Sequence, residues 1–528
     1  MVGGGPVGLA LAGDLGWRGV SCLLVEQSDG SIYQPRMDLV GIRTMEFCRR
    51  WGIVDRVEAS PYPRDRPQDN VYVTSLCGGW ELGRERMPSM GEDRPPPESP
   101  QKRERCPQNM FDPILRDWAV SFPSVSLRYR CRLVSFTEET DRVAAEVEDV
   151  ASGRRERITA SYLVGCDGAG SAVRERLGLR MLGNPVLTYT TNLIFRCPDF
   201  DTIHDKGRGY RFMFIGPEGT WATIVAINGR DQWRMSIIGS AEPRELTTDE
   251  IRAAIRRAVG RDFAYEILSV VPWIRRELAA ERYGSGRAFI AGDAAHAMSP
   301  TGGFGMNTGI GDAVDLSWKL AATLGGWGGP ALLEAYSAER QPVGIRNVTE
   351  ASGNLRRTIS PGENPAITDD TREGAQVRAE VGRRFAATRR REWFTLGVHL
   401  GYRYEGSPIC WPDGTEAPPD DPNTYVPTAR PGGRAPHVWL ADGRSTLDLY
   451  GPAFTLLRLG GADPQPLVEA AGKRGVPLTV VTLREEAVRV AYERQLVLVR
   501  PDGHVAWRAD APPGDPLAVI DRVRGAGP

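Results

Sequence analysis

The sequence contains few cysteines, and none of them stands close to another. The eight cysteines of this 528-residue chain occupy positions 22, 48, 77, 106, 131, 166, 197 and 410, so there is no C-x-x-C pair. This spacing excludes the usual zinc-binding and dithiol motifs. Isolated thiols are typical of a reducing compartment, and we expect a cytoplasmic protein.

A strong net charge and long apolar runs are also lacking. The 66 Lys and Arg residues balance 67 Asp and Glu residues, which gives a formal net charge of −1. This balance argues against a nucleic-acid or acidic-membrane partner. No segment approaches the roughly 20 apolar residues that cross a bilayer. The chain opens on Gly3-Gly4-Gly5 and not on a basic segment with an apolar core, so we expect no signal peptide.

Glycine is concentrated at a turn typical of nucleotide binding. The pattern Gly3-x-Gly5-x-x-Gly8 precedes a helical stretch and then the apolar segment 22–25, which ends at Glu26. This order predicts half of a Rossmann-like dinucleotide-binding fold, with a pyrophosphate at the helix N-terminus and Glu26 on the ribose. It does not separate NAD from FAD. The predicted cofactor-binding residues of the turn are Gly3, Gly5, Pro6, Val7 and Gly8.

Two later motifs favour FAD. In the first, 165–174, Asp167 stands at a strand-to-helix junction; in the second, Asp293 ends a strand before a glycine-rich loop that opens a helix. Asp293 can accept hydrogen bonds from polyol hydroxyls, and the backbone amides of the loop can face the pyrimidine edge of a flavin. The alternative is a plain β-to-α turn. The loop residues predicted to bind the cofactor are Pro300, Gly303, Gly305, Met306 and Asn307.

The segment 186–275 has alternating, aromatic-rich stretches, which predict a mostly antiparallel sheet suited to line an organic substrate. Tyr189, Tyr210 and Phe212 are the predicted substrate contacts, although each also fits an ordinary strand position.

The glycine turn, the Asp167-Gly168 motif and the Gly292-Asp293 motif, in this order, resemble the class A flavoprotein aromatic hydroxylases, the para-hydroxybenzoate and phenol hydroxylase family. The resemblance covers most of residues 1–355. It implies non-covalent FAD, NADPH or NADH as the transient electron donor, and O₂. In that family a C4a-hydroperoxyflavin transfers oxygen to an aromatic ring, so the resemblance implies hydroxylation of a phenolic or polycyclic aromatic substrate.

The resemblance also suggests roles for single residues. Arg43 and Gln108 would contact the ADP-ribityl portion, Asp167 would help shape the site for nicotinamide and pyrophosphate, and Asp293 would hold the ribityl chain. Asp38, in Arg36-Met37-Asp38, would accept the proton of a substrate hydroxyl. The alternative for Asp38 is a salt bridge in an exposed loop.

The C-terminal part resembles the thioredoxin-like tail of many of these hydroxylases, but no cysteine follows position 410, which excludes thioredoxin chemistry. We expect a packing or dimerisation role, and hence a homodimer. The expected fold is α/β: a Rossmann-like FAD-binding domain (1–185 and 276–355) with an inserted antiparallel substrate-binding sheet (186–275), a helical connection (356–428) and a thioredoxin-like domain without redox cysteines (429–528).

Two departures from the family pattern stand out. Only Met1 and Val2 precede the glycine turn, where relatives carry a short apolar strand, so either the sequence starts late or the sheet lacks most of a central strand. Phe304 replaces a glutamine found in many relatives. Two other functions remain open, namely epoxidation or Baeyer–Villiger oxidation of a polyketide, and non-catalytic redox sensing with bound FAD. The absence of a cysteine pair disfavours a flavin disulfide reductase.

Overall fold

The structure, a computed structural model, describes residues 1–359, 364–388 and 390–527 of the chain. Its nucleotide-binding sheet is parallel, with β1 (Cys22–Val25) beside β6 (Val125–Arg128) and β10 (Leu163–Gly165) beside β17 (Ala288–Ile290). Val2 joins the two halves by bridging Val25 and Gly165 in parallel. The segment before the glycine turn thus contributes one bridging residue to the sheet.

Three helices cover this sheet because their facing sides are apolar or small. The first, α1 (Pro6–Trp17), is buried from Val7 to Gly16 and lies between α4 (Gln108–Val120) and α7 (Phe304–Leu324). A Cβ at Gly13 would lie 2.1 Å from the Trp118 ring, so this glycine is what permits the close approach of α4. Smaller elements complete the domain, namely α2 (Ile42–Arg50), α3 (Val54–Glu58), α5 (Ala172–Arg176), β2 (Leu39–Val40), β5 (Glu104–Arg105), β7 (Cys131–Glu138), β8 (Val143–Asp149), β9 (Arg155–Ala160) and β16 (Gly284–Ser285).

The substrate sheet is wider than the segment 186–275. Its order is β18-β15-β11-β14-β13-β12-β3-β4, and all neighbours are antiparallel except β12 and β3. The strands are β3 (Asn70–Val73), β4 (Glu81–Glu85), β11 (Met181–Arg196), β12 (Arg211–Gly216), β13 (Gly219–Ala226), β14 (Gln232–Ile238), β15 (Glu266–Ala280) and β18 (His296–Met298). The first part of the chain therefore supplies two strands of this sheet.

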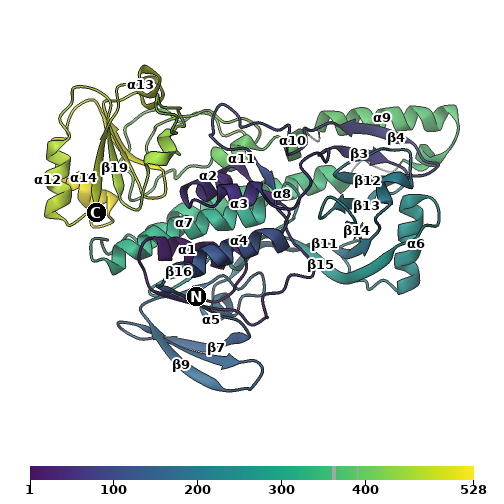
Figure 1. The fold of residues 1–528 in the computed structure, drawn as a ribbon, viewed down its shortest axis with the longest axis horizontal. Coiled ribbons are helices and arrows are strands. Elements are labelled where there is room, and N and C mark those ends of the chain that lie inside the picture. Colours follow the sequence, from purple (N-terminus) through teal and green to yellow (C-terminus); the bar gives the residue numbers. More distant parts are fainter. Residues whose placement is uncertain (360–363, 389, 528) are drawn as a thin grey trace.

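One face of the substrate sheet is a hydrophobic core covered by α6 (Thr248–Val259) (Figure 1). Phe212 lies in this core, fully buried, with its ring 5.2 Å from the ring of His204. The prediction that Phe212 contacts the substrate is therefore wrong, because α6 and its neighbours cover it. Tyr189 alternates with Thr190 along β11, so it lies on the same face as Leu193 of this core and not on the opposite face.

The connection to the C-terminal unit is helical, with α8 (Glu334–Ile359), α9 (Arg372–Thr388), α10 (Arg390–Trp393) and α11 (Leu396–Leu400). Residues 360–363 and 389 of the predicted connection 356–428 lie outside the described residues. Among the helices that are described, none combines the length and the apolar character that a bilayer span requires.

The C-terminal unit has the thioredoxin-like strand order β20-β19-β21-β22, with β20 parallel to β19 and the other pairs antiparallel. Its elements are β19 (Phe454–Arg458), β20 (Leu478–Thr482), β21 (Leu496–Val499), β22 (Val505–Ala509), α12 (Gln465–Lys473), α13 (Glu486–Tyr492) and α14 (Pro516–Val523). Figure 1 shows this unit and the substrate sheet at opposite ends of the molecule, with α1, α4 and α7 between them.

Buried arginines fix the C-terminal unit to the first domain. Arg500 donates from Nη1 to Glu339 Oε1 at 2.5 Å and from Nη2 to Asp315 Oδ1 at 2.9 Å, and all three side chains are nearly inaccessible to solvent. Arg434 forms a second buried pair, with Glu46 of α2. Because unpaired buried charges are costly, both pairs hold the two units in one arrangement.

Candidate functional site

The glycine turn has the geometry of a phosphate-binding loop. Gly3 has a φ of +103°, a conformation that favours glycine. A Cβ at Gly8 would lie 2.0 Å from the Gly3 carbonyl oxygen, so a larger residue there would displace the backbone. The N-terminus of α1, at Gly5, has no side-chain cap. Its first-turn amides and its dipole are thus free to hold an anion.

Glu26 lies against this turn, at the end of β1. Its Oε2 accepts a hydrogen bond from the Gly4 amide at 2.7 Å, and its Oε1 accepts one from the Ser28 amide at 2.7 Å. Each carboxylate oxygen retains a further lone pair, which suits a ribose diol.

Val7 brings the first and last FAD motifs together. A Cβ at Gly292 would lie 2.9 Å from Val7 Cγ2, and one at Gly309 would lie 2.5 Å from the same atom. Because Gly292 and Gly309 have no side chains, Val7 can pack between the turn that carries Asp293 and helix α7. Sequence spacing alone could not show this contact.

The carboxylate of Asp293 has no hydrogen-bond donor or ion-pair partner among the described residues. Its side chain is exposed to solvent, and no described residue donates a hydrogen bond to it. Surrounding protein nevertheless raises the pKa of Asp293 by burial, and His296 and Arg36 only partly offset this effect. The Asp293 carboxylate is thus open to solvent but has protein close around it. It is suited to accept hydrogen bonds from the hydroxyls of a ligand that fills the space beside it.

The N-terminus of α7 lies next to Asp293. Gly303 caps the helix with a φ of +70° and no side-chain bond, and a Cβ at Gly305 would lie 3.9 Å from Asp293 Oδ1. Asn307 secures this loop, since its Oδ1 accepts from the Gly41 amide at 2.8 Å and its Nδ2 donates to the Leu39 carbonyl at 3.2 Å. Asn307 thus joins the predicted cofactor-binding loop to residues 39–41, which follow Asp38.

The Phe304 ring lies against this loop, since a Cβ at Gly302 would come 2.4 Å from its Cζ. Its ring is buried beside Val398 and Ala351 and forms an edge contact with His399, with centroids 6.0 Å apart. The departure at this position therefore places a buried ring between Gly302 of the loop and the protein interior.

Arg43 does not point into the predicted site. Its Nη1 donates to Glu46 Oε2 at 2.8 Å and its Nη2 to the Asp502 carbonyl at 3.0 Å, and the guanidinium stacks on Phe47. The contact with the ADP-ribityl portion is therefore not supported, because this buried side chain is bound to α2 and the C-terminal unit.

Gln108 and Asp167 form hydrogen bonds with neighbouring protein groups. Gln108 accepts from the Arg36 amide at 3.0 Å and donates to Asp112 at 3.1 Å, where burial raises the pKa of Asp112 to about 8. Asp167 accepts from Ser171 Oγ at 2.5 Å and the Val173 amide at 3.2 Å, so its carboxylate caps α5. Asp167 thus holds this turn at the start of α5.

Asp38 is the centre of a buried polar cluster. Arg105 Nη1 donates to its Oδ1 at 2.9 Å, and the Tyr210 hydroxyl donates to its Oδ2 at 2.5 Å. The Arg105 guanidinium lies 3.6 Å from the centroid of the Tyr210 ring. The structure thus brings together two predicted site residues, and Asp38 is not in an exposed loop.

The charges of this cluster favour an ionised Asp38. Burial acts to raise the pKa of Asp38, but Arg105 and Arg234 together with the Tyr210 hydrogen bond outweigh this effect and hold the pKa below its usual range. Burial raises the pKa of Tyr210, so this hydroxyl stays protonated. Sequence reasoning missed Arg105, since its only signal is its place directly before the Cys106-Pro107-Gln108 motif, and the pairing of Leu39 with Arg105 is a tertiary contact.

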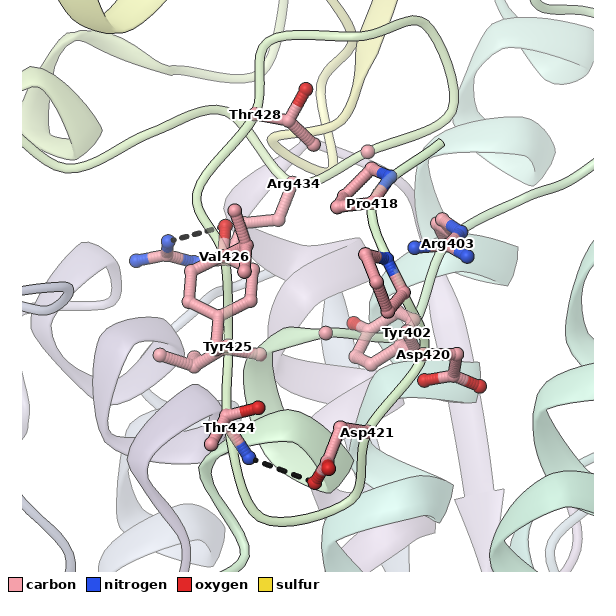
Figure 2. Close-up of a pocket in the computed structure, with 14 residues that line it drawn as sticks. Tyr402, Arg403, Pro418, Asp420, Asp421, Thr424, Tyr425, Val426, Thr428 and Arg434 are labelled. Carbon is pink, nitrogen blue, oxygen red and sulfur yellow. Dashed lines mark hydrogen bonds between the residues drawn. The ribbon is translucent and has the colours of Figure 1, made fainter. Parts of the chain in front are cut away.

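The pocket shown in Figure 2 is a different feature. It is lined by residues 400–434, including Tyr425, whose hydroxyl accepts from Arg434 Nη1 at 3.4 Å. None of the predicted cofactor or substrate residues lines it, so it belongs to the junction with the C-terminal unit.

These features fit FAD. The uncapped turn at α1 suits the pyrophosphate, Glu26 the adenosine ribose, the free carboxylate of Asp293 the ribityl chain, and the uncapped N-terminus of α7 the flavin ring.

Comparison with known proteins leads to the same cofactor. An FAD binding domain model matches residues 1–351, and an aromatic-ring hydroxylase C-terminal model matches residues 428–526. The chain is 32% identical to the FAD-dependent monooxygenase apdD of Emericella nidulans, over 97% of this chain and 87% of that protein.

Two solved structures are similar over nearly the whole chain. RebC, soaked with chromopyrrolic acid and with bound 7-carboxy-K252c, is 39% identical with a TM-score of 0.92, over 100% of this chain and 98% of that one. The flavin-dependent monooxygenase PieE, in complex with FAD and substrate, is 32% identical with a TM-score of 0.87, over 99% of this chain and 98% of that one. The chain therefore belongs to the FAD-dependent aromatic-ring hydroxylases, a family of monooxygenases.

Proposed function

We propose that this protein hydroxylates a phenolic or polycyclic aromatic substrate with O₂ and NADPH or NADH, and that the substrate lies beside Asp38 and Tyr210. The observation that supports this proposal is the cluster of Asp38, Tyr210 and Arg105. This cluster lies where the substrate sheet meets the segments with the predicted FAD motifs. Tyr210 directly precedes β12 of the sheet, and the strand after Asp38 leads to Gly41, which is bonded to Asn307 of the flavin loop.

Bound FAD would supply the electron-transfer and oxygen-transfer chemistry. The chain's own task is to place an aromatic ring and to increase its electron density. A phenol has a pKa of about 10, and Arg105 and Arg234 hold the pKa of Asp38 below its usual range, so complete proton transfer to Asp38 is strongly unfavourable. Asp38 is thus too weak a base to hold the substrate proton.

We infer instead that Asp38 acts through Tyr210. The carboxylate accepts the tyrosine proton in a 2.5 Å hydrogen bond, which leaves the lone pairs of the tyrosine oxygen for the substrate hydroxyl. Arg105, which donates to Asp38 at 2.9 Å and lies over the Tyr210 ring, keeps this carboxylate ionised as the acceptor. The substrate proton is then shared with Tyr210 while oxygen is transferred, and Asp38 positions that acceptor. This role revises the prediction that Asp38 removes the proton itself.

The test is a panel of phenols, aromatic acids and polycyclic phenols, with NAD(P)H consumption, hydroxylated product and H₂O₂ measured together. Tyr210→Phe and Asp38→Asn should keep FAD and lower the hydroxylation rate by about 10²–10⁴-fold, with more H₂O₂ per NAD(P)H. Tyr162→Phe, which removes a hydroxyl from a half-buried ring outside this cluster, is the matched control. Normal coupling in both cluster variants would refute the role, and stimulation by ketones in place of phenols would indicate Baeyer–Villiger oxidation.

The proposal includes a homodimer, which light scattering of the purified protein would test.

A further inference from the structure

Asp112 of α4 is a buried carboxyl group without a counter-charge. It is 6% exposed, and no cation among the described residues forms an ion pair with it. Its Oδ2 accepts a hydrogen bond from Gln108 Nε2 at 3.1 Å, whereas its Oδ1 is buried and has no hydrogen-bond partner in the described chain. Because a buried carboxylate without a cation is costly, such a group keeps its proton.

The titratable groups that face Asp112 supply no positive charge. They are the thiol of Cys106, just before α4, and the phenol of Tyr129, directly after β6. Burial raises the pKa of both groups, so both are neutral at pH 7. Burial also raises the pKa of Asp112 to about 8, and the hydrogen bond from Gln108 offsets only part of this effect. Asp112 is therefore an uncharged carboxylic acid at neutral pH.

The hydrogen bond to Asp112 fixes the orientation of the Gln108 side chain. Because Nε2 donates to Asp112, Oε1 is turned towards the backbone amide of Arg36, from which it accepts a hydrogen bond at 3.0 Å. The backbone amide of Gln108 donates to the carbonyl of the residue after Arg36, also at 3.0 Å. Arg36 in turn faces Asp293, the residue that suits the ribityl chain. Asp112 thus reaches the cofactor site through Gln108.

Asp112 also lies on the adenosine side of the FAD site. Tyr129 faces both Asp112 and Glu26, and Glu26 suits the adenosine ribose. The pyrophosphate of FAD brings negative charge to the glycine turn beside Glu26. Since like charges repel, an anionic cofactor favours the uncharged form of Asp112.

We propose that Asp112 is a positioning residue of the FAD site, and that FAD binds tightly only while this carboxyl group carries its proton. The uncharged acid holds Gln108, and Gln108 holds the segment that starts at Arg36. By linkage, FAD and the proton each strengthen the binding of the other. The affinity for FAD is then constant at neutral pH and declines as the pH rises through the pKa of Asp112. This inference concerns the cofactor site alone and does not rest on the proposed hydroxylation.

The experiment measures the dissociation constant of FAD with the full-length chain, by flavin fluorescence, between about pH 6.5 and 9.5. For the unsubstituted protein it should be constant below about pH 8 and rise about 10-fold per pH unit above it. Asp112→Asn keeps an acceptor for Gln108 but cannot ionise, so its affinity should be within about 3-fold of the unsubstituted value at pH 7 and independent of pH. Asp112→Leu removes the acceptor and should weaken FAD binding by about 2- to 10-fold at every pH.

Asp117→Asn is the matched control, because Asp117 belongs to the same helix but is half exposed and pairs with Arg56 and Arg116. Its pH profile should match that of the unsubstituted protein. Thermal unfolding of the FAD-free proteins over the same pH range separates loss of FAD from loss of the fold. Asp112→Asn should be more stable than the unsubstituted protein at pH 9, because the latter must then bury a charged carboxylate.

Two results would overturn the proton linkage. One is an FAD affinity of the unsubstituted protein that does not change with pH. The other is the same pH dependence in Asp112→Asn, which would assign the proton to Cys106 or Tyr129. An unchanged FAD affinity in Asp112→Leu would refute the positioning role of Asp112. The predicted pH dependence in a protein that hydroxylates no phenol would uphold this inference and contradict only the proposed function.

Discussion

Replacement of Asp293 by Asn should have opposite effects on FAD binding and on the stability of the FAD-free protein. The carboxylate accepts no hydrogen bond from the described residues, so its lone pairs are available to a ligand. A hydrogen bond to a charged acceptor contributes about 1.5–3 kcal/mol, which corresponds to a 10- to 100-fold weaker FAD affinity in Asp293→Asn. The affinity can be measured by titrating the FAD-free protein and following flavin fluorescence.

The FAD-free variant should be as stable as the unsubstituted protein or slightly more stable. Burial raises the pKa of Asp293, so its contribution to folding is fully present below the unfolded pKa and is lost as the pH rises through the folded pKa. At neutral pH the ionised carboxylate therefore destabilises the fold. Because water reaches this exposed side chain and screens it, the gain from removing the charge should be small.

Asp312→Asn is the matched control, because Asp312 is fully buried with its donors in place: the Gly292 amide at 3.1 Å, His296 at 2.7 Å and Arg340 at 2.8 Å. Burial acts to raise the pKa of Asp312, but His296 and Arg340 lower it, so this group stabilises the fold at neutral pH. Its replacement should cost about 3–5 kcal/mol even without FAD. Thermal unfolding of both FAD-free variants compares the two effects on stability. A large loss of stability in Asp293→Asn, or unchanged FAD affinity, would refute the assignment of Asp293 as a ligand of the ribityl chain.

Three further changes test other parts of the structure. Gly8→Ala should abolish FAD retention, because its Cβ would lie 2.0 Å from the Gly3 carbonyl, and the flavin-to-protein absorbance ratio would show this. Glu339→Gln should destabilise the protein by about 3–5 kcal/mol in urea unfolding, because Arg500 and Lys319 both donate to this buried carboxylate. An unchanged free energy of unfolding would contradict the conclusion that this ion pair holds the C-terminal unit to the first domain. Phe212→Ala should cost about 3–5 kcal/mol of stability and leave the affinity for a phenolic substrate in the correctly folded fraction unchanged. A selective loss of affinity would return Phe212 to the substrate site.

The parts of the fold that depend on local sequence were predictable. The turn, helix and strand from Gly3 to Glu26 follow from glycine spacing and an apolar run, and the structure has α1 and β1 there. The strand of Asp293 and the helix after Gly303 follow for the same reason. Such features need only neighbouring residues for their explanation.

The contacts that could not be predicted join distant segments. Tyr210 and Asp38 are 172 residues apart in the sequence, and Arg105 reaches Asp38 through the pairing of β2 with β5. Arg43 was misassigned because its position near a cofactor motif gave no sign of Asp502, which is 459 residues away. Phe212 was misassigned because alternation in a strand shows that two faces exist but not which face is covered by a helix.

The most direct test of the account is the origin of the oxygen in the product. The FAD-loaded protein, NAD(P)H, a hydroxyaryl substrate and ¹⁸O₂ should give a product that carries one ¹⁸O atom for each NAD(P)H consumed in the coupled reaction. Repetition with H₂¹⁸O and ordinary O₂ should give no label. Oxygen from water, or NAD(P)H oxidation that yields only H₂O₂ with every substrate of the panel, would contradict the assignment of this protein as an aromatic hydroxylase.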